Sequence, residues 1–328
     1  MKHTIIAAGL SVVAGAAFAQ TPVLTVYTYD SFVSDWGPGP AIETAFEATC
    51  ACDLHFVGAG DGAALLARLR LEGDTTEADI VLGLDTNLTA AARETGLFAP
   101  HGITPTGLTL PVVWDDAAFL PFDWGYFAFV HRADLAEVPT SFAALAASDL
   151  SIVIQDPRSS TPGLGLLMWV QAAHGDDAAT IWDGLADNIV TVTPGWSEAY
   201  GLFLEGEADL VLSYTTSPAY HLIAEEDAGF AAAPFDEGHY LQIEVAGMLA
   251  ASDQPDLARR FLEFMLSPAF QEVIPTTNWM YPAALASDAL PAGFETLIQP
   301  ETALLVAPDQ AAALRDEALA IWQSALAR

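Results

Sequence analysis

The sequence predicts an α/β protein with two lobes, each a mainly parallel sheet flanked by helices. Strand-like apolar runs alternate with helical segments on both sides of the middle of the chain, which is typical of parallel sheets. Two runs, residues 122–130 and 240–251, are long enough for strands that cross from one lobe to the other. No internal repeat, low-complexity tract or long linker interrupts the chain. These observations favour two lobes joined by shared strands over two independent domains.

The first 19 residues have the pattern of a secretory signal peptide. Lys2 supplies the positive start, residues 4–16 are apolar or small, and Ala17-Phe18-Ala19 matches a cleavage site. The alternative is an uncleaved membrane anchor, but the apolar run is shorter than the roughly 20 residues that a membrane span needs. We therefore expect an exported, soluble chain that is cleaved after about Ala19.

The chain is strongly acidic, with 43 Asp and Glu residues, 10 Lys and Arg residues and a formal net charge of −33. Such a surface repels nucleic acids and anionic lipids, so we expect neither as a partner. The charge either solvates the protein in a salty medium or attracts a cationic ligand. We favour solvation, because so many charges cannot all line one site.

Cys50 and Cys52 are the only cysteines. An exported chain permits a disulfide between them, although the loop it would close is very short and contributes little chain entropy. A structural bridge, a free pair and a redox site all remain open at this point. We favour a structural role, because the spacing is not that of a thioredoxin-like motif.

The first third of the chain alternates between strands and helices, the order that builds a parallel sheet. Asp61 precedes one helical segment and has a side chain well suited to cap it. The expected strands are residues 22–29, 54–57 and 79–84, and the expected helices are residues 42–48, 63–71 and 88–95.

The alternation resumes after the aromatic strand at residues 122–130. Thr161 followed by Pro162 predicts a helix start, with Thr161 as the N-cap and Pro162 at the first helical position. The other expected elements are a buried strand at residues 151–154, helices at 142–147, 256–266, 268–273 and 311–326, and a loop at 278–282.

Residues 191–220 combine a short buried strand, a tight turn, a helix, an apolar strand and a second turn. Pro194 and Gly195 break the first strand, and Gly206 ends the helix. In open α/β sheets, ligands bind at the carboxyl ends of the strands. This stretch therefore brings aromatic and hydroxyl side chains to a predicted ligand crevice.

The sequence carries no recognisable catalytic motif. Residues 195–199 (GWSEA) resemble a nucleophile elbow but lack its final glycine, and no P-loop or dinucleotide fingerprint occurs. No two histidines have the spacing of a zinc motif, and the acidic run at 72–79 lacks EF-hand spacing. We therefore expect neither an enzyme nor a metal protein, and no cofactor.

Two other features recur along the chain. Strand-to-helix turns at Asp61-Gly62, Ser160-Thr161 and residues 195–197 expose backbone N–H groups that can bind anions, although ordinary capping explains any single one. Aromatic residues also lie beside turn residues, where they are free to stack on a flat ring and hold a cation. The pattern indicates a ligand with an aromatic ring, a positive charge and, optionally, a phosphate.

The chain resembles the periplasmic thiamine-binding proteins of bacterial ABC transporters, along nearly all of the expected mature protein. The Cys-x-Cys pair also fits that family. The segments that carry the resemblance are 24–32 (LTVYTYDSF), 35–40 (DWGPGP), 78–85 (ADIVLGLD), 121–130 (PFDWGYFAFV), 155–165 (QDPRSSTPGLG), 192–201 (VTPGWSEAYG), 212–220 (LSYTTSPAY) and 274–282 (IPTTNWMYP).

The resemblance implies a two-lobed periplasmic binding protein of type II that closes by hinge motion around thiamine, thiamine monophosphate or thiamine diphosphate. It also implies delivery to a membrane permease with a cytoplasmic ATPase, by a protein that is monomeric in solution. The residues implied to line the ligand are Asp61, Gly62, Ser160, Thr161, Trp196, Tyr214, Thr215, Thr216 and Ser217, with Tyr29, Tyr220 and Trp279 as aromatic walls.

We assign roles to these residues by chemistry. Ser160, Thr161 and the backbone near Trp196 suit a phosphate or hydroxyethyl group, whereas the aromatic walls suit the pyrimidine and thiazolium rings. Asp61 suits an amino group or a cationic ring. The acidic composition and the varied turns around Asp61 and Ser160 depart from the family pattern, which affects the expected ligand preference more than the ligand class.

We expect residues 20–121 and about 238–280 to form one lobe, residues 122–237 to form the other, and residues 281–328 to pack across both. The alternative functions are capture of another cargo, such as a polyamine or ferric ion, and an exported enzyme acting on thiamine. Ferric capture favours adjacent tyrosines, which this sequence lacks. Catalysis needs a nucleophile beside a base, and neither cysteine lies in a ligand motif.

Overall fold

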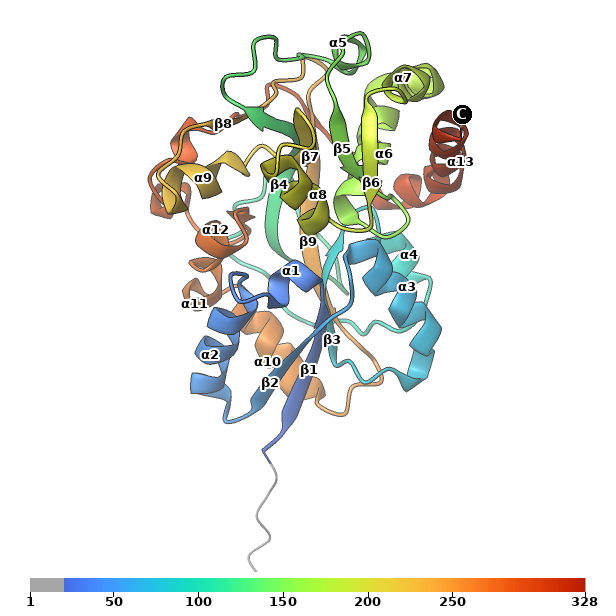
Figure 1. Ribbon diagram of the computed structural model, residues 1–328. Helices are drawn as coiled ribbons and strands as arrows, with labels where there is room; N and C mark the ends of the chain where they lie inside the picture. The colour runs from blue at the N-terminus through green and yellow to red at the C-terminus, as the bar shows by residue number, and fades with distance from the viewer. Residues whose placement is uncertain (1–20, 328) are drawn as a thin grey trace, which may run out of the picture.

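The computed structural model describes residues 21–327 and has two lobes, drawn below and above the centre of Figure 1. The predicted signal peptide lies outside the described residues. Within them, 11 strands form one connected sheet with the main order β2-β1-β3-β9-β4-β7-β5-β6. The predicted α/β class and the crossing strands are thus confirmed.

The lower lobe is built on strands β1, β2, β3 and β9. β1 pairs in parallel with both β2 and β3, whereas β9 runs antiparallel to its neighbours β3 and β4. The bounds are β1 Val23–Thr28, β2 Asp53–Gly58, β3 Ile80–Asp85, β4 Leu120–Arg132 and β9 His239–Met248.

Strand β4 joins the lobes, as its aromatic run predicts. Residues 120–126 pair with β9, and residues 127–132 continue into the upper lobe, where they pair with β7 and β8. There β5 pairs in parallel with β7 and β6. The remaining bounds are β5 Ile152–Gln155, β6 Ile189–Thr193, β7 Leu210–Tyr214, β8 Phe230–Ala232, β10 Tyr281–Pro282 and β11 Ala303–Leu304.

Helices cover both faces of the lower sheet, because alternate strand residues point to opposite faces. Leu24 and Val26 pack towards α2 and α10, while Tyr27 packs towards α3. The helices of this lobe are α1 Asp30–Val33, α2 Gly39–Cys50, α3 Gly62–Glu72, α4 Thr89–Arg93, α10 Pro255–Met265, α11 Pro268–Gln271 and α12 Ile274–Thr277.

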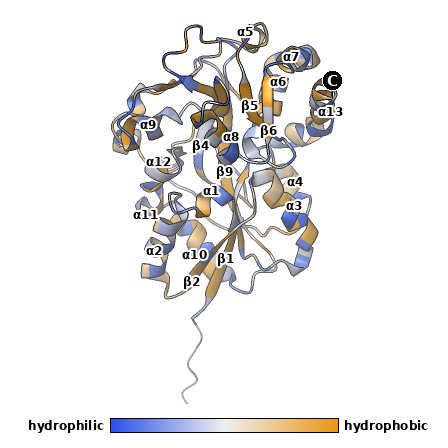
Figure 2. Ribbon diagram, viewed as in Figure 1, coloured by the Kyte–Doolittle hydropathy of each residue, from blue (hydrophilic) through white to orange (hydrophobic). Residues whose placement is uncertain are grey.

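The upper lobe has the same layered plan, with an aromatic core. The Trp169 ring packs against Phe129, Phe142 and Phe235, and its Nε1 donates to the Gly238 carbonyl at 2.9 Å. Figure 2 shows hydrophobic residues concentrated on the strands. The helices are α5 Phe142–Ala146, α6 Thr161–His174, α7 Ala178–Leu185, α8 Trp196–Leu204, α9 Pro218–Ala224 and α13 Pro308–Leu326, and the 3-10 turns are Gly73–Thr75, Gly175–Asp177, Ser287–Ala289 and Phe294–Thr296.

Three local predictions are wrong. The N-cap of α6 is Ser160, and Thr161 is already the first helical residue, so Pro162 stands one position later than expected. β6 is not buried, because it is the edge strand of the sheet, and Val190 is 52% exposed. The loop expected at residues 278–282 ends in the short strand β10, which pairs with β4.

Cys50 and Cys52 form a disulfide between the end of α2 and the start of β2. Both side chains are buried in the lower lobe, and Ala51 between them has a left-handed φ of 53°. The bridge closes the turn that joins a helix to a strand. This position supports the structural interpretation of the pair.

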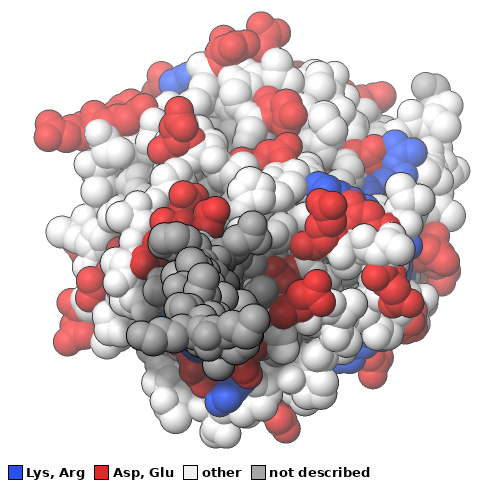
Figure 3. Space-filling model, turned by 90° about the horizontal axis from the view of Figure 1, so that it is seen from below, with Lys and Arg blue, Asp and Glu red and all other residues white. Residues whose placement is uncertain are grey.

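Acidic side chains are spread across the underside of the lower lobe, with few basic ones among them (Figure 3). On this face the negative charge is dispersed and not gathered at one place. This distribution favours the interpretation that the acidic residues solvate the protein. None of the helices in residues 21–327 combines the length and apolar character needed to cross a membrane.

The close packing of α6 on β4 yields a stability prediction. A Cβ added at Gly165 would lie 2.0 Å from the ring of the fully buried Phe127, so Gly165→Ala should lower the free energy of unfolding by about 1–3 kcal/mol. In α8, a Cβ at Gly201 meets nothing within 4 Å, so Gly201→Ala should be neutral or raise it by up to about 1 kcal/mol. Urea unfolding followed by circular dichroism measures both, and equal effects would contradict the packing.

Candidate ligand-binding site

A cavity of about 540 Å³ lies between the two lobes. The lower lobe contributes Tyr29, Asp61 and Glu244, and the upper lobe contributes one face of α8, the end of β7 and residues along α9. Residues 276–280, at the end of α12 (Ile274–Thr277) and just after it, also line the cavity. The cavity therefore lies at the strand ends, where an α/β sheet is expected to bind its ligand.

The structure brings most of the predicted site residues together at this cavity. Those that line it are Tyr29, Asp61, Trp196, Tyr214, Ser217, Tyr220 and Trp279. Those that do not line it are Gly62, Ser160, Thr161, Thr215 and Thr216. The second group is fully buried.

Asp61 links the lobes beside the cavity. Its carboxylate accepts from the Gly62 N–H at 2.8 Å, capping α3 as predicted, and from the Ser160 hydroxyl at 2.7 Å across the interface. The Ala64 N–H also donates to the Ser159 carbonyl at 2.9 Å. Burial raises the pKa of Asp61, while these hydrogen bonds oppose the rise. The N-termini of α3 and α6 therefore meet around one carboxylate.

Gly62 is required by this close approach. A Cβ at Gly62 would lie 2.2 Å from the Thr161 hydroxyl oxygen and 2.9 Å from the Gly83 carbonyl oxygen. Thr161 is 1% exposed, and its hydroxyl has no hydrogen-bond partner. In this structure, Gly62 and Thr161 lie at the contact between the lobes and do not line the cavity.

One wall of the cavity is aromatic and belongs to α8. The Trp196 ring stacks on Tyr200, with centroids 5.0 Å apart, and its Nε1 donates to the Ser213 hydroxyl at 2.8 Å. Trp36, from the lower lobe, lies 6.3 Å from Trp196 and is 54% exposed. The Ser213 and Ser217 hydroxyls are hydrogen-bonded at 2.7 Å, which fixes the turn after β7.

The opposite wall is formed by Tyr220 and Trp279, whose rings lie 5.4 Å apart. Trp279 has a left-handed φ of 57°, a strained conformation for a bulky side chain, and such strain is concentrated at functional sites. The Trp279 N–H donates to the Ile274 carbonyl at 3.0 Å. The conformation presents the indole at the cavity in place of a regular continuation of α12.

Three carboxyl groups lie in a row beneath the cavity. Register pairs Asp85 of β3 with Glu244 of β9, and Glu244 with Asp123 of β4, so the three side chains share one face of the sheet. Asp85 and Asp123 are fully buried and Glu244 is 6% exposed. We call this set the carboxyl row.

Two polar residues connect the carboxyl row to the cavity. The Tyr29 hydroxyl donates to Glu244 Oε2 at 3.0 Å, and Asn278 Nδ2 donates to Asp123 Oδ2 at 2.6 Å. Asn278 and the Tyr29 hydroxyl also contact each other at 2.9 Å. The network holds Glu244 at the cavity surface.

Burial strongly favours the neutral form of these acids. It raises the pKa of Asp85 and that of Asp123 to about 7, and it raises the pKa of Glu244 well above its ordinary value, with the charge of Asp123 adding to the effect. No Lys or Arg among the described residues lines the cavity. A cationic ligand would supply the missing positive charge.

Sequence reasoning missed Glu244, Asp123, Asn278, Tyr200 and Trp36. Glu244 did carry a signal, because it is a single carboxylate in the apolar strand YLQIEVAGML, and a buried acid there indicates a functional site. Trp36, Asn278 and Asp123 lie in segments that support the family resemblance. Their presence at or under the cavity depends on strand register and loop packing.

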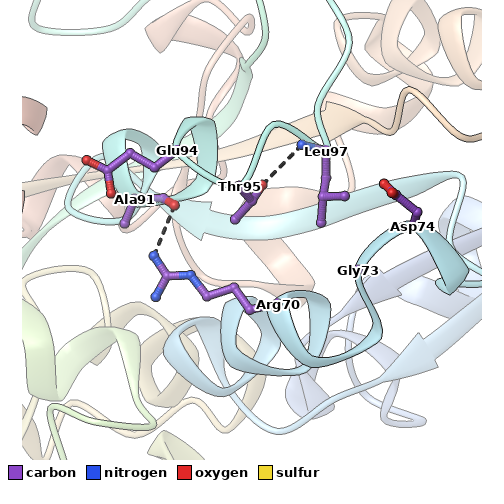
Figure 4. Close-up of a pocket in the computed structure, with 7 residues that line it drawn as sticks. All are labelled: Arg70, Gly73, Asp74, Ala91, Glu94, Thr95 and Leu97. Carbon is purple, nitrogen blue, oxygen red and sulfur yellow. Dashed lines mark hydrogen bonds between the residues drawn. The ribbon is translucent and has the colours of Figure 1, made fainter.

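A second hollow of about 430 Å³ lies between α3 and α4, outside the cavity. There Arg70 donates to the Ala91 carbonyl at 3.0 Å, with Asp74 and Glu94 nearby (Figure 4). One arginine that is already bonded, facing two acids, defines no ligand chemistry. Among residues 21–327, no group of three His, Cys, Asp or Glu side chains is arranged to hold a metal ion.

Comparison with known proteins agrees with this geometry. The model of the family "Bacterial extracellular solute-binding protein" matches residues 38–272. This chain belongs to that family. It is 57% identical to the thiamine-binding periplasmic protein of Escherichia coli (strain K12), over 94% of both chains, and 51% identical to that of Brucella melitensis, over 93% of this chain and 92% of the other.

Comparison with solved structures supports the same family assignment. A solved structure of a periplasmic thiamin binding protein has a TM-score of 0.91 and 56% identity, covering 94% of this chain and 97% of its own. Iron-bound HitA from Pseudomonas aeruginosa has a TM-score of 0.74 at 19% identity, which shows the fold alone. The predicted type II periplasmic binding fold is therefore confirmed.

The raised pKa of Asp85 predicts a dependence of stability on pH. The folded protein holds a proton on Asp85 up to about pH 7, whereas the unfolded chain releases it near pH 4, so this group stabilises the fold at low pH and loses that effect as the pH rises through 7. Relative to wild type, Asp85→Asn should gain up to roughly 1.4 kcal/mol per pH unit between pH 5 and 7. Urea unfolding across this range measures the difference, and a constant difference would contradict the raised pKa.

Proposed function

We propose that this protein captures thiamine, thiamine monophosphate or thiamine diphosphate between its lobes in the periplasm and delivers the ligand to an ABC importer. The observation that carries the proposal is an aromatic-walled cavity above buried carboxyl groups, in a chain 57% identical to a thiamine-binding periplasmic protein. Trp196 and Tyr220 come from the upper lobe and Glu244 comes from the lower lobe, so lobe closure completes the site.

The chemistry of the cavity matches the two rings of thiamine. Trp196, Tyr220 and Trp279 provide faces for stacking, and a π face also attracts the positively charged thiazolium. Glu244 provides a carboxyl group at the cavity surface that can pair with a positive charge once it is ionised, and Asp123 lies beside it on the neighbouring strand. A neutral ring of the same size would gain the stacking but not the charge pairing.

The site for a phosphate or hydroxyethyl group remains part of the proposal. We place it near the start of α6, where Ser160 and Thr161 lie beside Asp61. The carboxylate of Asp61 already accepts from the Ser160 hydroxyl there, so a phosphate must displace or reorient it. Hydrogen bonding to Asp61 suits an amino or hydroxyl group without any rearrangement.

We propose binding without turnover, cofactor or metal. The related proteins are named as binding proteins. In line with the resemblance, we expect a monomer that meets a membrane permease coupled to a cytoplasmic ATPase.

The direct test is titration of the mature protein with thiamine and its two phosphates, followed by tryptophan fluorescence. Trp36, Trp196 and Trp279 line the cavity, so a bound ring should change the emission. We expect saturation at equimolar ligand and recovery of the ligand unchanged. Saturation by spermidine or ferric ion but not by thiamine would overturn the proposal in favour of another cargo, and a modified ligand would favour an enzyme.

Removing one aromatic wall should weaken binding without unfolding the protein. Trp196→Ala deletes a stacking face, so we expect the Kd for thiamine to rise about tenfold or more while the thermal midpoint falls by only a few degrees. Calorimetric titration and thermal melting measure the two effects. Leu71→Ala, whose side chain is 88% exposed on α3, is the matched control and should leave both unchanged. An unfolded Trp196→Ala variant would instead place this residue in the core.

A further inference from the structure

The carboxyl row places three buried acids side by side beneath the cavity. Asp85, Glu244 and Asp123 stand on three adjacent strands, and directly opposite residues have Cβ atoms about 4.5–5.5 Å apart. Carboxylates this close and this buried cannot all be ionised without a cation among them. At least one of them must therefore hold a proton.

The surroundings of Glu244 contain further acids and no base. Tyr29 and Asp61 face it from the lower lobe, Tyr214 faces it from β7, and the neutral Asn278 bridges Tyr29 and Asp123. Arg315 of α13 interacts with Asp85 at the far end of the row, and no described basic residue interacts with Glu244 or Asp123. The positive charge needed at Glu244 therefore comes either from a proton or from the ligand.

The hydrogen bonds indicate which group holds the proton. Asp123 accepts from Asn278 through Oδ2, while its buried Oδ1 has no hydrogen-bond partner, and Glu244 lies directly across the strand pair from it. Glu244 accepts from the Tyr29 hydroxyl through Oε2, which leaves Oε1 to carry a proton towards Asp123. A proton on Glu244 would give Asp123 Oδ1 its missing donor and leave one protonated carboxyl beside one carboxylate.

We propose that Glu244 holds a proton against Asp123 while the cavity is empty and releases it to solvent when a cationic ligand binds. The O–H bond of Glu244 breaks, the proton leaves to water, and the resulting carboxylate pairs with the positive charge of the ligand. Capture thus exchanges one proton for one cation, and the total charge of the cavity stays constant. This inference rests on the proposed function, because it takes the ligand to be a fixed cation such as a thiazolium.

The exchange has a defined pH dependence. Because the proton must leave before the cation is fully paired, affinity rises as the pH rises, by at most about tenfold per pH unit for one proton. The rise extends through neutral pH, since burial raises the pKa of both members of the pair, and it levels off once the empty protein has lost the proton. Acidification favours release of the ligand.

The test counts protons by calorimetry. Thiamine is titrated into the mature protein at pH 7 in buffers of different ionisation enthalpy, and the slope of observed heat against buffer enthalpy gives the protons released. We expect close to one proton for wild type and none for Glu244→Gln. Glu244→Asp keeps a carboxyl group and should retain the release. Glu263→Gln, at an exposed position on α10, is the matched control and should behave as wild type.

The outcomes separate this inference from the proposed function. Thiamine binding without proton release in wild type would overturn the exchange and leave capture intact. Unchanged release in Glu244→Gln would also overturn it, by assigning the proton to another acid such as Asp61. Failure of wild type to bind thiamine, seen in the fluorescence titration, would instead overturn the proposed function. The wild-type proton count needs no variant to fold.

Discussion

The pairing of β9 with β3 on one side and β4 on the other is the interaction on which the rest of the molecule depends. Backbone hydrogen bonds fix the register of these strands, and register decides which side chains share a face. That register aligns Asp85, Glu244 and Asp123 under the cavity. Strand β4 then continues into the upper lobe, where its pairing with β7 positions Tyr214 at the cavity.

The site is built at a cost to the stability of the empty protein. Buried acids and unpartnered hydroxyls such as that of Thr161 destabilise the fold, and the large hydrophobic cores of both lobes offset this cost. A bound cation would relieve part of the destabilisation, because it pairs with charges that the protein leaves unpaired. Stability, protonation and ligand capture are therefore coupled through the same three carboxyl groups.

The aromatic walls and the contact between the lobes do not depend on the register of β9. Trp196 and Tyr220 lie at the starts of α8 and α9, where local turn chemistry places side chains at the strand ends. The contact between Asp61 and Ser160 depends on how closely two helix N-termini approach, which the small residue Gly62 permits. One set of residues lines the cavity, and the other links the two lobes.

The sequence by itself determined the elements and much of the aromatic site, because apolar periodicity, helix caps and turn residues act over a few neighbouring positions. It predicted the α/β class, the crossing strand β4, the cap at Asp61 and the wall residues Trp196 and Trp279. Only the tertiary structure decided the edge position of β6, the contact of Ser160 with Asp61, and the carboxyl row. These depend on strand order, register and the approach of the two lobes, which join residues far apart in the chain, such as Asp61 and Ser160 at a separation of 99 positions, and leave little trace in local pattern.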